Sequence, residues 1–166
     1  KFDKDIKAEA HVDEEMKKIL AGFPKSAHPM GVLSSLTSAL IAFNPSSVNV
    51  SSEKDMYHAI VRILGKFPVL VAWTLRKKKG LPLEYGSSSL GYVENIHKMM
   101  FRRPDQEYET NEIVIEALNK LLILHADHEQ NCSTSTVRIV GSSHAGLFAS
   151  LSAGISALWG ALHGGA

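Results

Sequence analysis

The sequence predicts an all-α protein, a multi-helical bundle in which helices pack on helices. The strict alternation of polar and β-branched residues that is typical of strands is nearly absent, and apolar residues recur with helical spacing instead. Proline or glycine stands where most of these periodic segments begin or end. A length of 166 residues is that of one ordinary domain, so we expect one helical core.

The first two expected helices are delimited by clear stop signals. The first covers residues 4–20 and ends before Gly22 and Pro24. The second covers residues 29–43, because proline suits the first turn of a helix, where its missing N–H is not needed. Asn44 and the proline after it end this second helix.

A third and a fourth helix are expected on either side of Pro68. Ser52 caps the third, over residues 53–66, and the proline ends it because an interior proline normally breaks a helix. The fourth covers residues 68–79 and ends in four basic residues, 76–79, followed by Gly80. We interpret this basic run as a solvated helix end, since no aromatic residues alternate with the cations as a nucleic-acid site would require.

The other expected helices are a fifth over residues 90–101, a sixth capped by Thr110 or Asn111 and ending at Leu124, a short one over residues 133–140, and a last one from Ala145 to Leu162. The last helix is composed almost entirely of small and apolar residues. Such a helix has to be covered on all sides, either by its own domain or by a partner chain.

Composition excludes several classes of protein. The formal net charge is +1, so the chain has neither a polybasic arm for nucleic acid nor an acidic tail. The single cysteine, Cys132, rules out an internal disulfide and indicates a reducing compartment. We find no signal peptide and no apolar run of about 20 residues, so no membrane contact is expected. The first residue is not Met, and we expect a piece of a longer protein.

Residues 125–129 gather two imidazoles and two carboxylates. A metal site is disfavoured, because His125 and His128 are three residues apart rather than four and no third ligand is evident. A purely structural turn remains open. We favour an anion or substrate site, since an imidazolium donates well to carboxylate oxygens.

A second candidate is His163, which follows the last expected helix and precedes Gly164 and Gly165. Two glycines let the backbone come close to a ligand. A histidine at a helix end beside so open a turn is a candidate catalytic group, although His-Gly-Gly alone is a weak signal.

Taken together, these motifs resemble citrate synthase of the bacterial type. The resemblance extends from about Phe23 to Ala166. It is carried by His28–Met30, by Tyr92–Asn95 with Met99–Phe101, by His125–Arg138 with Gly141–Ser143, and by Leu158–Ala166. It implies an all-α fold, of which this chain is part of the large domain. It also implies condensation of oxaloacetate with acetyl-CoA to give citrate and CoA.

The resemblance also implies roles for individual residues. His163 matches the histidine that stabilises the enol of acetyl-CoA by a hydrogen bond, and His128 matches one that binds oxaloacetate or citrate. Ser133, with Asn131 beside it, takes the place of a group that orients the enol-stabilising histidine. Leu162 lines the acyl-CoA pocket, and no metal is implied.

By the same resemblance, the enzyme needs no cofactor, since acetyl-CoA is a substrate, and it is a cytoplasmic bacterial homodimer joined through the helix from Ala145 to Leu162. The catalytic aspartate, a second catalytic histidine and the substrate-binding arginines lie downstream in this family, and a strand-containing region lies upstream. We therefore expect this chain to be inactive alone. Regulation by NADH is not expected, because Ala8, Glu9 and Ala10 replace the basic patch of NADH-inhibited members.

Three alternatives stay open. A 2-methylcitrate synthase would use propionyl-CoA, and one methylene discriminates by only about 1–3 kcal/mol. A non-catalytic helical interaction module could keep the same scaffold. A metal-dependent hydrolase built on His125, Asp127 and His128 is the third.

Overall fold

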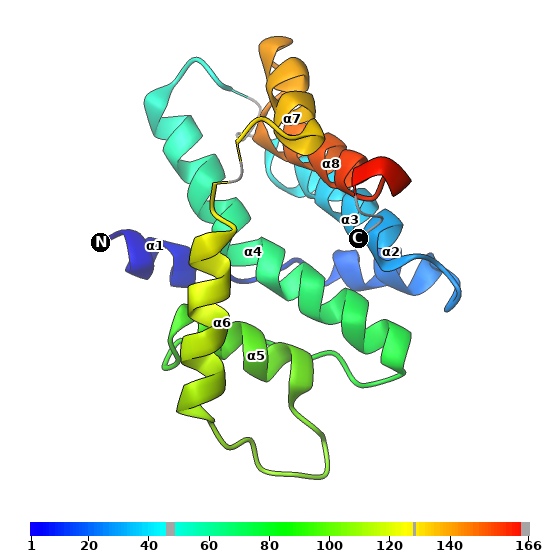
Figure 1. Ribbon diagram of the computed structural model, residues 1–166, viewed down its shortest axis with the longest axis vertical. Helices are drawn as coiled ribbons and strands as arrows, with labels where there is room; N and C mark the ends of the chain where they lie inside the picture. Colours follow the sequence, from blue (N-terminus) through cyan, green and yellow to red (C-terminus); the bar gives the residue numbers. More distant parts are fainter. Residues whose placement is uncertain (46–48, 128, 164–166) are drawn as a thin grey trace.

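The computed structural model describes residues 1–45, 49–127 and 129–163, and every regular element in these ranges is helical. The all-α prediction is therefore confirmed. Along the chain, coloured from blue to red in Figure 1, the elements are α1 (Phe2–Ala8), α2 (Glu15–Gly22), α3 (Pro29–Phe43), α4 (Glu53–Lys79), α5 (Tyr92–Phe101), α6 (Glu112–Leu124), α7 (Cys132–Ser142), α8 (Leu147–Leu158) and the 3₁₀-helix η2 (Ala161–His163).

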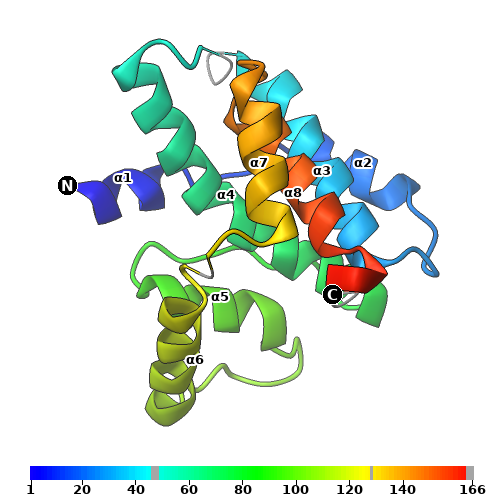
Figure 2. The same ribbon diagram turned by 45° about the horizontal axis from the view of Figure 1, so that its top comes forward.

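The long helix α4 runs through the middle of the fold and separates two groups of helices. Helices α3, α7 and α8 lie together on one side of it, whereas α5 and α6 lie on the other, in both Figure 1 and Figure 2. The core is shared by α2, α3, α4, α5 and α8, and its most buried large side chains include Met16, Leu36, Leu70, Trp73 and Phe148. Burial of this apolar surface supplies the main stabilisation of the bundle.

Helix α3 begins and ends where the sequence predicts. The Nδ1 atom of His28 accepts a hydrogen bond from the backbone N–H of Met30 at 3.3 Å, and Pro29 occupies the first turn. At the other end the backbone leaves the helix at Asn44, whose side chain donates to the carbonyl of Leu40 at 2.8 Å. Local signals at both ends are sufficient to define this helix.

The prediction that Pro68 separates two helices is wrong, because α4 is continuous from Glu53 to Lys79. Ser52 caps it as predicted, accepting from the backbone N–H of Asp55 at 3.2 Å. Pro68 has no N–H to donate to the carbonyl of Leu64, one turn earlier. The hydroxyl of Tyr92, on α5, donates to that carbonyl instead, at 2.8 Å. Helix α4 changes direction near its middle in Figure 1, so the proline bends the helix without ending it.

The single helix predicted over residues 4–20 is also wrong, because residues 9–14, between α1 and α2, are not helical. The ammonium group of Lys66 donates to the carbonyls of Glu9, at 3.0 Å, and His11, at 2.5 Å, which removes both from a helical ladder. Helix α1 also lies very close to α4, since a methyl group on Gly65 would be 2.7 Å from the carbonyl oxygen of Ile6. Tertiary contacts therefore override the local helical pattern here.

Burial of Lys66 in this contact lowers the pKa of its ammonium group, and the nearby Glu9 carboxylate, 3.7 Å away, opposes that shift.

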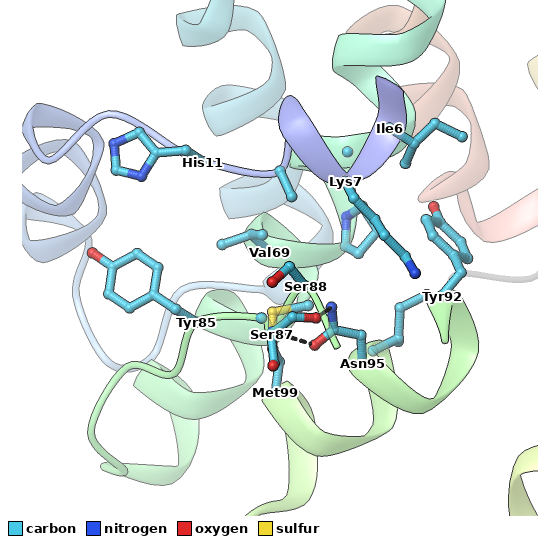
Figure 3. A pocket seen from close by; sticks show the side chains of 15 residues that line it. Ile6, Lys7, His11, Val69, Tyr85, Ser87, Ser88, Tyr92, Asn95 and Met99 are labelled. Carbon is cyan, nitrogen blue, oxygen red and sulfur yellow. Dashed lines mark hydrogen bonds between the residues drawn. The ribbon is translucent and has the colours of Figure 1, made fainter. Parts of the chain in front are cut away.

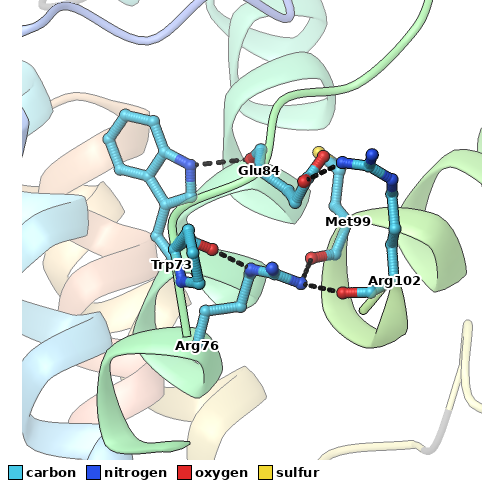
Figure 4. Close-up of polar contacts among 6 residues, drawn as sticks. Trp73, Arg76, Glu84, Met99 and Arg102 are labelled. Carbon is cyan, nitrogen blue, oxygen red and sulfur yellow. Dashed lines mark hydrogen bonds and ion pairs between the residues drawn. The ribbon is translucent and has the colours of Figure 1, made fainter. Parts of the chain in front are cut away.

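The interpretation of residues 76–79 as a solvated helix end is wrong for Arg76, which is fully buried. Its guanidinium group donates to three carbonyls, those of Pro82, Met99 and Arg102 (Figure 4). The last two belong to the end of α5, where helix carbonyls lack partners. Arg76 thus ties the end of α4 to the end of α5, while Lys78 and Lys79 are exposed as predicted.

Helix α8 is shorter than the predicted range of Ala145 to Leu162, because Gly146, at φ 86°, precedes its first residue. Its small residues bring α7 close, and a methyl group on Gly154 would lie only 2.6 Å from Cγ2 of Val137. On its other side, the hydroxyl of Ser34 on α3 meets those of Ser152, at 3.1 Å, and Ser156, at 2.7 Å. Neighbours within the chain therefore cover much of this apolar helix.

An 18-residue window of α4 has the length and composition of a membrane span, but half of that window is buried inside this fold. The contacts of α4 with α1, α3, α5 and α8 identify it as a core helix.

None of the residues of helix α6 is buried, and the same is true of α7. Its N-terminus is capped by Asn111, which accepts from the backbone N–H of Val114 at 3.2 Å. Several of its large apolar side chains are exposed, with Ile113 at 80% and Leu124 at 71%. This amount of uncovered apolar surface is typical of a face that another polypeptide covers.

Candidate functional site

The histidine turn lies directly after α8. Its 3₁₀-helix, η2, is closed by the N–H of His163, which donates to the carbonyl of Gly160 at 2.9 Å. The imidazole of His163 is partly buried, whereas the neighbouring Leu162 is fully exposed. The turn therefore directs the imidazole toward the protein and the leucine side chain away from it.

The fold brings His163 to the start of α7, where Ser133 and Asn131 lie. The Nε2 atom of His163 is 3.3 Å from the hydroxyl oxygen of Ser133. That hydroxyl donates to Oδ1 of Asn131 at 2.8 Å. Oδ1 of Asn131 also accepts a hydrogen bond from the backbone N–H of Thr134, at 2.8 Å. Three of the residues singled out by the sequence therefore form one chain of hydrogen bonds.

This chain of hydrogen bonds couples the tautomer of His163 to the direction of the Ser133 hydroxyl proton. A serine hydroxyl has one proton, and here it is directed to Asn131. The hydroxyl oxygen is then free only to accept, so Nε2 of His163 carries the proton and donates to it. The Nδ1 atom keeps its lone pair as long as the imidazole is neutral and the serine proton stays on Asn131.

An open cleft of about 570 Å³ lies beside this group. Four of the residues that line it are sequence candidates or their direct neighbours, Asn131, Cys132, Leu162 and His163, and the rest are the small residues Ala157, Gly160 and Ala161. The small side chains leave room for a ligand next to the imidazole.

The turn before α7 is described only in part, since His128 lies outside the described residues. His125 and Asp127 are both exposed and make local hydrogen bonds, from His125 Nδ1 to the carbonyl of Leu121 at 2.7 Å and from the N–H of Glu129 to Asp127 Oδ1 at 3.2 Å. Both bonds stabilise the turn. Within the described ranges, no three His, Cys, Asp or Glu residues come close enough together to hold a metal ion.

One aromatic contact at this end of α8 was not anticipated from the sequence. The ring of Trp159 stacks on that of His28, with centroids 5.0 Å apart and planes 19° from parallel. The indole also lies over the first turn of α3, where a methyl group on Gly31 would be 3.3 Å from it. Because the contact joins residues 131 positions apart, no local pattern indicates it.

A second cavity, of about 480 Å³, lies between α1, α4 and α5 (Figure 3). Several of its polar groups already have partners. The side-chain amide of Asn95 bonds both the N–H and the carbonyl of Ser87, at 2.8 and 2.9 Å, and Lys7 pairs with Asp3 at 3.3 Å. Burial raises the pKa of Tyr92 to about 12. The bonds of Asn95 hold the loop before α5 in place, and Lys7 is paired within α1, so the cleft beside His163 is the better candidate for chemistry.

The whole chain, residues 1–166, matches the sequence model of a family described as "Citrate synthase, C-terminal domain". The chain belongs to the citrate synthase family. Its relatives include the citrate synthase of Corynebacterium glutamicum, 46% identical over 166 residues, and citrate synthase 1 of Mycobacterium tuberculosis, 46% identical over 161 residues. The chain spans 38% and 37% of the lengths of these two proteins.

Solved structures agree with this assignment. The fold matches citrate synthase from Pyrobaculum aerophilum with a TM-score of 0.87 at 28% identity, over 99% of this chain and 42% of that one. It matches citrate synthase from Thermotoga maritima with a TM-score of 0.76 at 27% identity, over 97% of this chain and 39% of that one.

Proposed function

We propose that this chain is a large-domain part of a longer citrate synthase, which condenses oxaloacetate with acetyl-CoA and water to give citrate and CoA. Membership of the family supports the enzyme class, and the share of about two fifths of its relatives' length supports a longer parent. The observation that carries the proposal is the contact between His163 and Ser133. It joins two sequence motifs 30 residues apart beside an open cleft.

In this proposal, His163 donates a hydrogen bond to the thioester oxygen of acetyl-CoA while a carboxylate removes the methyl proton. The negative charge that develops on that oxygen is stabilised by a donor already in position. A neutral His163 can donate from Nδ1 only if Nε2 accepts. Rotation of the Ser133 hydroxyl from Asn131 to Nε2 supplies that arrangement, so the two side chains select the tautomer of the catalytic imidazole.

The other site residues complete the proposal. His128 binds the oxaloacetate or citrate end of the substrate, and Leu162 lines the pocket for the acyl-CoA, consistent with its full exposure at the cleft. The catalytic aspartate and the second catalytic histidine belong to the rest of the parent, so we expect the isolated chain to form no citrate. No cofactor is required, and the parent is a cytoplasmic homodimer whose subunits meet through the region from Ala145 to Leu162.

The test compares the full-length parent with its His163→Gln and Ser133→Ala variants. Loss of the histidine should lower kcat for citrate formation by about 10²–10⁴, the usual contribution of a positioned proton donor, while KM for oxaloacetate changes little. Loss of the serine should lower kcat less, because the imidazole remains but can turn. A His163→Gln variant with unchanged kcat would overturn the proposal.

The same assay, run with propionyl-CoA in place of acetyl-CoA, decides the acyl specificity. We expect the higher kcat/KM with acetyl-CoA, and a reversed order would identify a 2-methylcitrate synthase. Wild-type parent that condenses neither acyl-CoA with oxaloacetate would instead favour the non-catalytic helical module.

A further inference from the structure

We propose that His28 and Trp159 form a clamp that positions the catalytic turn, so that both are positioning residues for His163. The clamp is the stack of these two rings, and it joins the start of α3 to the end of α8. This inference rests on the proposed role of His163 and adds two residues to the machinery of that reaction.

The backbone connection from Trp159 to His163 is short and continuous. Trp159 is the residue directly after α8, and its N–H donates to the carbonyl of Ile155 at 3.1 Å. The next N–H, of Gly160, donates to Ala157 at 3.0 Å, and the carbonyl of Gly160 accepts from the N–H of His163 at 2.9 Å. A displacement of the Trp159 ring is therefore passed to the imidazole through four residues of hydrogen-bonded turn.

The other half of the clamp is itself fixed. His28 caps α3 through Nδ1, and Pro29 restricts the backbone directly after it. Helices α3 and α8 are held in register by the hydroxyl of Ser34, which also donates to the backbone carbonyl of Ser152 at 2.9 Å. The imidazole of His28 is thus a rigid platform against which the indole rests.

The indole is only partly covered by the described residues. Trp159 is 42% exposed, so apolar burial alone holds it weakly. Besides the imidazole, it lies against the glycine surface of Gly31, where no side chain intervenes. Offset or parallel stacking of aromatic rings at about 5 Å is attractive, and here it sets the orientation of the indole at the end of α8.

The experiment uses the full-length parent with His28→Asn, which keeps a good helix cap but removes the ring. We expect kcat for citrate formation to fall about tenfold with KM for oxaloacetate within twofold, because misplacing a reacting group affects the chemical step. Trp159→Leu should give the same loss, and Trp159→Phe, which retains a ring, should restore most of the rate. His58→Asn, the same change on α4 away from the clamp, is the matched control.

Fluorine NMR of protein labelled with 5-fluorotryptophan detects the stack independently of activity. The Trp159 signal is the one that is missing from the spectrum of Trp159→Phe. His28→Asn should shift that signal, because the ring current of the imidazole is removed. An unchanged signal, an unchanged kcat, or an equal loss in His58→Asn each overturns the clamp. If the wild-type parent forms no citrate while His28→Asn still shifts the signal, the proposed function fails although the stack exists.

Discussion

We predict that Tyr92 stabilises the bend in α4, because its hydroxyl makes the hydrogen bond to the Leu64 carbonyl that Pro68 cannot make. In Tyr92→Phe, the carbonyl of Leu64 loses its donor, which is 2.8 Å away in the intact protein. An acceptor left without a partner away from water costs about 1–3 kcal/mol. Since Leu64 and Tyr92 are only partly buried, we expect a decrease of about 1–2 kcal/mol in the free energy of unfolding.

A double-mutant cycle isolates this contact. In Pro68→Ala, residue 68 regains an N–H that can donate to Leu64, so adding Tyr92→Phe to this background should cost only about 0.5 kcal/mol or less. Urea unfolding of the four proteins at pH 7 measures the difference, which we expect to be about 1 kcal/mol. Tyr57→Phe, which removes a hydroxyl that donates to Asp5 on α1, is the control and should cost the same in both backgrounds.

Equal costs of Tyr92→Phe in the two backgrounds would refute this explanation of the bend. A second test uses pH. The pKa of Tyr92 is raised to about 12 by burial, whereas an unfolded tyrosine ionises near 10. The folded state therefore keeps the proton longer, and its stabilising contribution, complete below about pH 10, is lost as pH rises toward 12. The free energy of unfolding of the wild type should therefore fall between about pH 10 and 12. Since Tyr92 is partly exposed, we expect this fall to be smaller by about 1–2 kcal/mol in Tyr92→Phe.

Three further predictions concern other contacts. Arg76→Met leaves the carbonyls at the end of α5 without donors and should lower the free energy of unfolding in urea by about 2–4 kcal/mol. Gly154→Ala places a methyl group against Val137 and should cost about 1–3 kcal/mol, part of which Val137→Ala recovers. The 166-residue chain should sediment as a dimer or larger species at micromolar concentration because of the exposed apolar face of α6, and a clean monomer would contradict this.

The helices whose ends are decided by neighbouring residues could be predicted from the sequence. Helix α3 has the predicted ends, because its cap, its first-turn proline and the Asn44 that follows it all lie in or next to it. The capping of α4 by Ser52 and of α6 by Asn111 belongs to the same class. In each case the deciding contact spans no more than four residues.

The errors came from contacts between residues distant in sequence. Pro68 is tolerated inside α4 because of a hydroxyl 24 residues further on, and the break between α1 and α2 depends on Lys66, more than 50 residues away. Arg76 is buried because carbonyls of a later loop and helix receive its guanidinium group. Periodicity and propensity contain no information about such partners.

The candidate site also contains residues that the sequence indicates and residues that only the fold brings together. Charge, spacing and glycine content drew attention to residues 125–129 and to His163, but the family resemblance was needed to connect them with Ser133. The described structure brings His163, Asn131 and Leu162 to one cleft, and Ser133 is hydrogen-bonded to His163 and Asn131 beside it. The stack of His28 on Trp159 had no sequence signal, since stacking over this separation requires knowledge of how α3 and α8 pack.

The position of Cys132 offers a spectroscopic handle. It is the single cysteine of the chain, it is exposed, and it borders the cleft beside His163. A maleimide spin label therefore attaches at one defined place on this chain without any mutation. Two labelled chains that associate would report one intermolecular distance by pulsed electron resonance, and that distance would show how the two clefts are placed relative to each other.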